Sequence, residues 1–143
     1  MLDDIYKGGI VTITQHYVSD EQSIPAGTAF KKLFVAAEKN GWHRVRLIDV
    51  SGEPYSEENQ AADGFERRAA ARLRKGETWI EEREQRGGVQ HLRVATPIPV
   101  VSSRCIMCHE NYRDVPAGQP IGALTYLLPV DGPLQSPHAP QSK

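Results

Sequence analysis

Cysteine, methionine and long apolar runs are all scarce in this chain of 143 residues. Only two cysteines are present, which excludes the disulfide framework of a small secreted fold, because such folds use more cysteines at wider spacing. No apolar stretch is long enough to cross a bilayer. The 17 basic and 18 acidic residues nearly cancel, so nucleic acid is not expected as a partner.

The overall composition fits one globular domain. A hydrophobic content of 39% and a charged content of 24% are typical of a folded chain, and 143 residues suit a single core. No internal repeat is visible. The tail from Asp131 to Lys143 is rich in Pro, Ser, Gln and Ala, which predicts disorder there and a single domain over residues 1–130.

Three helices are expected. Residues 5–18 fit a helix or a strand, and a helix is favoured because several apolar residues share one helical face. Residues 29–40 carry a clearer apolar stripe, with Thr28 as the expected N-cap and Gly41 as the stop. A third helix is predicted behind Asp63, because Asp63 and Glu66 have the spacing of a capping box; this helix should end at Gly76.

Four strands are expected around these helices. Residues 44–50 alternate in polarity, and residues 78–85 and 89–96 flank Gly87-Gly88, which predicts a hairpin. Residues 121–130 form a last apolar strand, whereas residues 53–62 are loop-like. This order predicts an α+β domain, an antiparallel sheet with its helices to one side. Trp42 and Trp79 are interpreted as core residues, with contact to a cofactor as the alternative.

The residues Cys105-Ile106-Met107-Cys108-His109 form C-x-x-C-H, the pattern of covalent c-type haem attachment. Two thiols at this spacing can each form a thioether to one vinyl group of a porphyrin, and the adjacent His109 can then bind the iron. A structural zinc site would need a second pair of ligands, and a redox C-x-x-C would open a helix within a βαβ unit. We therefore expect one covalent haem c, held by Cys105 and Cys108, with His109 as an axial ligand.

The second axial position of the iron has several candidate ligands. Met107 lies inside the attachment motif and Met1 is a chain terminus, so methionine is not expected there. The distal ligand is then a histidine, a water or nothing. The histidine candidates are His16, His43 and His91, whereas His138 is discounted because it lies in the tail.

From Arg44 to Val130 the chain resembles the single-haem, PAS-like c-type sensor family of bacteria, including cyanobacteria. The resemblance rests on C-x-x-C-H and on weaker features that arrive in the same order: Arg46-Leu47-Ile48-Asp49, Glu53-Pro54, Glu58-Asn59, Asp63-Gly64-Phe65-Glu66, Leu92 to Ile98, Gly118 and Ile121 to Tyr126. It implies a PAS-like antiparallel sheet with an N-terminal helical segment and a haem loop before the last strand. Family members occur as extracytoplasmic sensing domains of chemotaxis receptors and histidine kinases, and as stand-alone proteins.

The N-terminal segment departs from the family pattern. Some members carry Ala-Ile-x-x-Cys there, and that Cys binds the iron. In this chain Thr12-Ile13-Thr14-Gln15-His16 has the same spacing with His in the Cys position. The resemblance therefore implies His16 as the distal ligand, with His43 as the alternative.

The expected function is haem-based sensing of redox state or of a diatomic gas such as nitric oxide. A monohaem electron-transfer cytochrome is the alternative, and a peroxidase-like or nitrite-reducing enzyme is a third interpretation. No paired carboxylates or nucleophile and base support an enzyme. Bacteria attach haem c outside the cytoplasm, so we expect a periplasmic protein whose export signal is missing from this chain, since Met1 to Asp4 is acidic. A homodimer and a redox or signalling partner are also expected.

Overall fold

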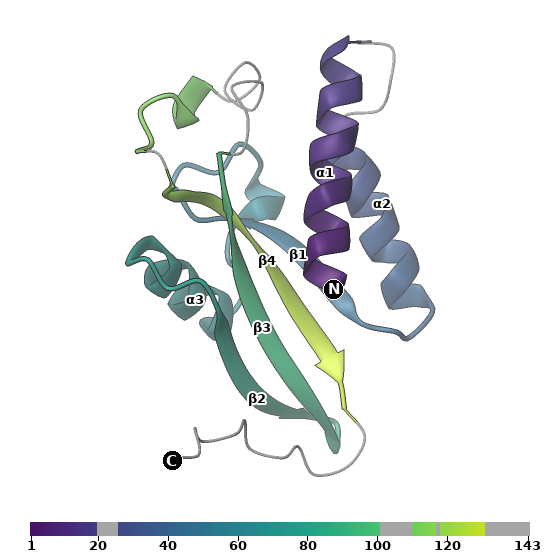
Figure 1. Ribbon diagram of the computed structural model, residues 1–143. Coiled ribbons are helices and arrows are strands. Elements are labelled where there is room, and N and C mark those ends of the chain that lie inside the picture. The colour runs from purple at the N-terminus through teal and green to yellow at the C-terminus, as the bar shows by residue number, and fades with distance from the viewer. Residues whose placement is uncertain (20–25, 101–109, 117, 131–143) are drawn as a thin grey trace, which may run out of the picture.

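The computed structural model describes residues 1–19, 26–100, 110–116 and 118–130 (Figure 1). Its elements follow one another as α1 (Leu2–Ser19), α2 (Ala26–Lys39), β1 (Arg44–Asp49), η1 (Glu57–Asn59), α3 (Gly64–Arg74), β2 (Ile80–Arg86), β3 (Val89–Pro99), η2 (Glu110–Tyr112) and β4 (Pro120–Pro129), where η marks a short 3-10 helix. The predicted tail, Cys105, Cys108, His109 and His138 lie outside the described residues.

The strands form one antiparallel sheet in the order β1-β4-β3-β2. The hairpin of β2 and β3 turns at Gly87 and Gly88, whose φ angles are +56° and +82° and favour glycine. The last strand, β4, pairs with both β1 and β3 and so lies inside the sheet. This arrangement confirms the predicted α+β fold with an N-terminal helical segment and is compatible with a PAS-like domain.

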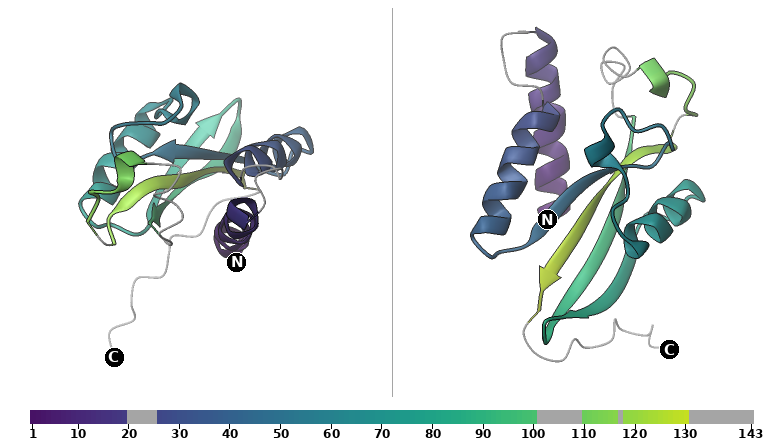
Figure 2. Two further views of the ribbon diagram at one scale, coloured as in Figure 1. Left: turned by 90° about the horizontal axis from the view of Figure 1, so that it is seen from above. Right: turned by 180° about the vertical axis from the view of Figure 1, so that it is seen from behind.

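Helices cover both faces of the sheet, so the prediction that they lie to one side is wrong (Figure 2). Helices α1 and α2 pack on the face that carries Val94 and Leu124. Helix α3 packs on the opposite face, against Ala95 and Ala123. Successive residues of a strand point to opposite faces, so apolar neighbours such as Val94 and Ala95 need a cover on each side.

Two local predictions about helix ends are confirmed and one is wrong. Asp63 is the N-cap of α3, and its carboxylate accepts a hydrogen bond of 2.9 Å from the backbone N–H of Glu66. Gly41, with φ +71°, closes α2 as predicted. Thr28 is not the N-cap of α2, because that helix begins two residues earlier, at Ala26.

Both tryptophans are exposed, which contradicts their interpretation as core residues. Trp42 is 66% exposed in the turn that follows α2, and Trp79 is 54% exposed just before the edge strand β2. The aromatic residues of the core come from elsewhere: Tyr6, Phe30, Phe34 and Tyr126 contact one another between α1, α2 and the sheet. Neither tryptophan belongs to the two apolar clusters formed by the described residues.

Candidate functional site

The C-x-x-C-H segment leaves the sheet and returns to it at one end. Strand β3 ends at Pro99, which pairs with Pro120 at the start of β4, so the chain between them begins and ends at the same edge of the fold. Residues 101–109, with the predicted haem ligands Cys105, Cys108 and His109, lie outside the described residues. The element directly after His109 is described, because η2 begins at Glu110 (Figure 1).

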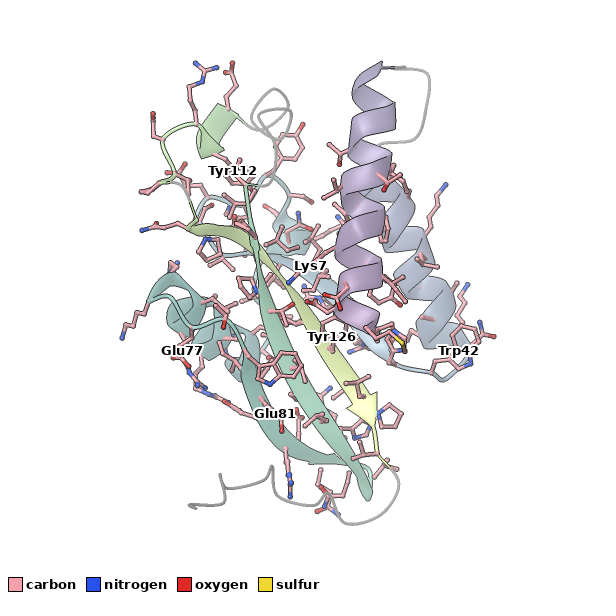
Figure 3. The ribbon with its side chains drawn as sticks, viewed as in Figure 1. Lys7, Trp42, Glu77, Glu81, Tyr112 and Tyr126 are labelled. Carbon is pink, nitrogen blue, oxygen red and sulfur yellow. The ribbon has the colours of Figure 1, made fainter. Side chains whose placement is uncertain are left out.

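Tyr112 attaches η2 to the sheet. The Tyr112 side chain is buried, and its hydroxyl donates a hydrogen bond of 3.4 Å to Oδ1 of Asp49, the last residue of β1 (Figure 3). Two other donors hold the Asp49 carboxylate, the Ser51 hydroxyl and the backbone N–H of Gly52, each at 2.7 Å. Residue 112 lies three positions beyond His109, so this contact positions the C-terminal flank of the motif against the end of β1.

Helix α1 is anchored to the middle of the sheet by its first turn. The Asp3 carboxylate accepts hydrogen bonds from the hydroxyls of Thr96 (2.6 Å) and Tyr126 (2.8 Å) and pairs with Lys7 at 2.8 Å. Burial alone would raise the pKa of Asp3, but these donors outweigh it and hold the pKa below its ordinary value. Burial and the nearby Asp3 carboxylate raise the pKa of Tyr126, which keeps its hydroxyl protonated as a donor.

The far end of α1 extends to the end of the sheet where β3 ends and β4 begins (Figure 1). His16 lies in the last turn of α1, and at 1.5 Å per residue it is about 20 Å along the helix from Asp3. The strand β3 continues for only about 10 Å from Thr96 to Pro99. The last turn of α1 therefore reaches past the sheet, on the side where the motif leaves β3.

His43 and His91 belong to the opposite end of the sheet. His43 directly precedes Arg44, which pairs with Leu127, and Leu127 is about 23 Å along β4 from Pro120. A ring nitrogen of His43, Nε2, shares a hydrogen bond of 2.8 Å with the Tyr6 hydroxyl. Burial lowers the pKa of His43, so its imidazole is held in the neutral form.

His91 is no better placed than His43. It pairs with Pro129, near the end of β4 that is farthest from Pro120. Its Nδ1–H donates a hydrogen bond of 3.0 Å to the Val89 carbonyl, within its own strand. Of the three histidines weighed from the sequence, only His16 belongs to an element that reaches the end of the sheet next to the motif.

Sequence reasoning missed the residues that hold α1 and η2 in place. Asp49, Thr96 and Tyr126 lie in segments that carry the family resemblance, but the sequence did not indicate their contacts. These contacts involve Asp3 and Tyr112 and join positions 63 to 123 residues apart in the chain. A polar residue at a buried strand position, such as Thr96, was a further signal. In the part of the chain that the structure describes, no group of three or more His, Cys, Asp or Glu side chains could hold a metal. Among the same residues, no helix is long and apolar enough to span a membrane.

One protein family accounts for most of the chain. The model of the Tll0287-like family matches residues 9–123, a range that includes the last two thirds of α1, the C-x-x-C-H motif and the start of β4. Comparison with curated proteins and with solved structures finds no match.

Proposed function

Because the chain belongs to the Tll0287-like family, a cyanobacterial-type family of haem-binding domains, we propose that it is a c-type haem sensor of redox state or of a diatomic gas. Cys105 and Cys108 hold one haem through thioethers, and His109 is its first axial ligand. The observation that supports the proposal is the C-x-x-C-H motif in a family of haem-binding domains. The described strands on either side of the motif also support it, because β3 ends and β4 begins at the end of the sheet that α1 reaches.

The donor set fits a haem better than another metal group. Two thiols and one imidazole within five residues match covalent attachment and axial ligation, whereas a closed zinc site would need a fourth ligand. When bound, the haem would supply an iron that changes oxidation state or binds a diatomic gas.

His16 is the proposed distal ligand. Neutral imidazole is a good ligand for iron, and an unperturbed histidine, with a pKa of about 6.5, is mostly neutral at physiological pH. A bond from His16 would tie the last turn of α1 to the haem segment, while Asp3 ties the first turn to Thr96 and Tyr126. With His16 bound, both ends of α1 would be held. With His16 released, the last turn would lose its tie to the haem segment, while Asp3 and the packing of Tyr6 in the core would still hold the rest of the helix.

This pair of states makes α1 the element that would transmit a signal. A change at the iron shifts the equilibrium between the two states of α1 only by the difference between the free energies with which His16 binds the two iron states. A signalling or redox partner would then contact α1 or α2, and pairing of two copies through these helices would give a homodimer. We further propose that the protein works outside the cytoplasm, where bacteria attach haem c.

The first test asks whether the haem is covalent. Protein that is denatured on a gel should keep its haem stain, and its mass should exceed that of the polypeptide by one haem. Loss of all haem on denaturation would rule out the thioether bonds to Cys105 and Cys108.

The second test is an absorption spectrum of the oxidised protein, of the dithionite-reduced protein and of the protein with nitric oxide. His16→Ala should convert a low-spin spectrum with two histidine ligands into a high-spin or water-bound one. The matched control is His43→Ala, which removes a histidine from the other end of the sheet and should leave the spectrum unchanged. A spectrum that keeps both ligands in every state would favour the alternative, an electron-transfer cytochrome.

A further inference from the structure

A hollow of about 50 Å³ opens on the face of the sheet that α3 covers, away from α1. Its lining includes four arginines from three strands, Arg44 and Arg46 of β1, Arg86 of β2 and Arg93 of β3. We propose that this hollow binds a small planar oxyanion, of which a short monocarboxylate such as acetate fits best. The proposal concerns a site apart from the haem segment and does not depend on the proposed function.

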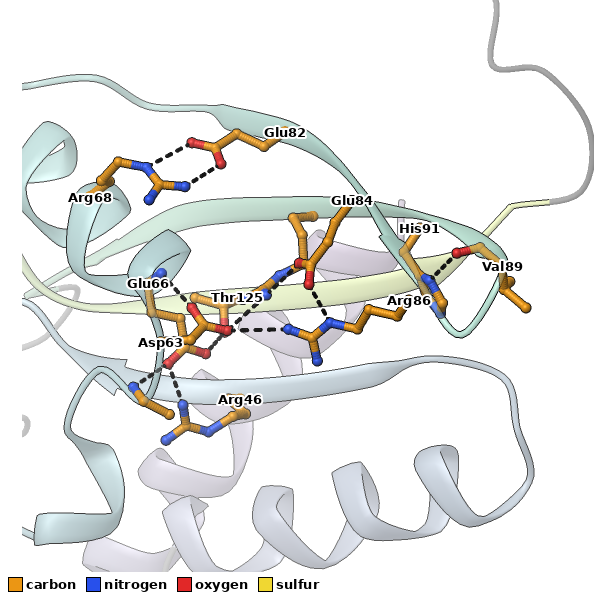
Figure 4. Close-up of polar contacts among 12 residues, drawn as sticks. Arg46, Asp63, Glu66, Arg68, Glu82, Glu84, Arg86, Val89, His91 and Thr125 are labelled. Atoms are coloured by element: carbon orange, nitrogen blue, oxygen red, sulfur yellow. Dashed lines mark hydrogen bonds and ion pairs between the residues drawn. The ribbon is translucent and has the colours of Figure 1, made fainter.

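The charges of the lining favour an anion. Four guanidinium groups line the hollow against two carboxylates, those of Asp63 and Glu66. Glu84 pairs with Arg86 (Figure 4) and with Arg93. Glu38 pairs with Arg44, and neither Glu38 nor Glu84 lines the hollow. The surface that a ligand meets is therefore cationic, even though the positive and negative charges of the whole network of arginines and carboxylates cancel.

The two lining carboxylates are already occupied by donors. Glu66 is 2% exposed and accepts hydrogen bonds from Arg46, from the Thr125 hydroxyl at 2.9 Å and from the Ala62 N–H at 2.7 Å. Asp63 accepts from Arg93 at 2.8 Å and from the Glu66 N–H at 2.9 Å. Because these oxygens are engaged, they compete poorly with a ligand for further donors.

Arg93 supplies the donor that lacks a partner. It is 4% exposed, and its Nη1 donates to Asp63 at 2.8 Å and to Glu84 at 3.0 Å, while its guanidinium carbon lies 4.3 Å from the centre of the Phe65 ring. Its Nε is buried and has no hydrogen-bond partner among the described residues. A buried donor without an acceptor costs free energy. Arg93 belongs to the lining of the hollow, so an anion that enters would meet this side chain.

Size and shape narrow the ligand to a small carboxylate or a similar anion. The hollow has more room than one water molecule needs and suits an anion of about three or four heavy atoms. Guanidinium groups match planar oxyanions because two parallel N–H groups can face two oxygens. Ala62 and Leu127 add an apolar wall, which suits the methyl group of acetate.

The experiment is a calorimetric titration of the haem-loaded full chain with sodium acetate, sodium formate and sodium nitrite, at constant ionic strength set with sodium chloride. The expected result is saturable binding with one site per chain, tightest for acetate, with no change in the haem absorption recorded in the same titration. Tighter binding of nitrite than of acetate would still place an oxyanion in the hollow but would assign the site to an inorganic anion.

Two variants locate the binding. Arg86→Gln removes a half-exposed arginine from the rim and should weaken binding about tenfold or more, the effect of losing one charge-assisted hydrogen bond. Arg93→Lys keeps the charge but removes Nε, and it should weaken binding by a similar factor. The control is Arg68→Gln, an arginine of α3 that pairs with Glu82 outside the hollow, and it should bind as the parent does.

Three outcomes would overturn the proposal. If none of the three anions binds more than chloride does, the hollow holds water only. If binding survives both Arg86→Gln and Arg93→Lys, the anion binds elsewhere. If binding always shifts the haem absorption, the anion binds the iron and not the hollow.

Discussion

Adjacent glycines in the middle of α1 provide a matched test of how closely α1 approaches α2. A Cβ added at Gly8 would meet no atom within 4 Å, whereas a Cβ added at Gly9 would lie 2.5 Å from Cζ of Phe30 in α2. Phe30 cannot swing aside freely, because it is 6% exposed and its ring contacts those of both Tyr6 and Phe34. Gly9→Ala should therefore strain the α1–α2 contact, and Gly8→Ala should not.

The magnitudes follow from two opposing effects. Replacing glycine by alanine inside a helix stabilises it by about 0.5–1 kcal/mol, and this gain is common to both variants. Gly9→Ala also forces a methyl group into a packed core, which costs about 1–3 kcal/mol. Because the helix gain cancels in the comparison, Gly9→Ala should be about 1–3 kcal/mol less stable than Gly8→Ala.

Urea unfolding of the oxidised protein, followed by circular dichroism, measures this difference in the free energy of unfolding. Gly8→Ala should be more stable than the parent, with a midpoint of thermal unfolding raised by about 2–4 °C. Equal stabilities of Gly8→Ala and Gly9→Ala would refute the close approach of α1 to Phe30. The haem spectrum adds a second measurement, since displacement of α1 by Gly9→Ala should weaken ligation by His16 and Gly8→Ala should leave it intact.

Three other predictions concern polar groups of the described residues. Glu66→Ala should lower the free energy of unfolding, measured by urea unfolding, by about 3 kcal/mol, because it leaves Arg46 and the Thr125 hydroxyl without their buried partner. The control is Glu82→Ala, which removes an exposed ion pair and should cost less than about 1 kcal/mol. The pKa of Asp3 is lower in the folded protein than in the unfolded chain, so the stabilising effect of Asp3 is present above about pH 4 and is lost as pH falls further. The thermal midpoint of the parent should therefore drop more steeply than that of Asp3→Asn between about pH 5 and pH 2. Parallel curves for the two proteins would contradict this. The pKa of His43 is lowered by burial, so the folded state loses stability as pH falls below about 6.5, and His43→Gln should flatten the stability curve between pH 7 and pH 5.

Short-range chemistry in the sequence predicted much of the fold. The capping spacing of Asp63 and Glu66, the paired glycines of the hairpin and the alternation of residues 44–50 each depend on neighbours within a few positions. Sequence periodicity therefore placed all three helices and all four strands close to their observed bounds. The prediction of Thr28 as the N-cap was wrong because a suitable residue type does not by itself fix where a helix begins. Helix α2 begins two residues earlier, at Ala26.

The candidate site likewise has one part that the sequence predicted and another that depends on the tertiary structure. The C-x-x-C-H motif is contiguous, so the sequence alone predicted Cys105, Cys108 and His109 as a haem-binding set. The preference for His16 over His43 came from the family resemblance. The sequence did not show where His43 lies along the sheet, because that depends on the pairing of β1 with β4, whose residues are more than 70 positions apart. That pairing puts His43 at the end of the sheet far from Pro99 and Pro120, whereas α1 reaches the end where β3 stops.

What the sequence determined by itself was local: the elements, the hairpin turn, the α+β class and the haem motif, because each follows from residues close together in the chain. Only the tertiary structure decided which faces of the sheet the helices cover, that Trp42 and Trp79 are exposed, and that Asp3 and Tyr112 hold α1 and η2 to the sheet. The same holds for the arginine-lined hollow, whose residues come from all four strands of the sheet and from the start of α3. The physical reason is that burial and ion pairing depend on distances in space. These distances are set by contacts between residues such as Asp3 and Tyr126 or Asp49 and Tyr112, which lie 123 and 63 positions apart, and no single segment encodes them.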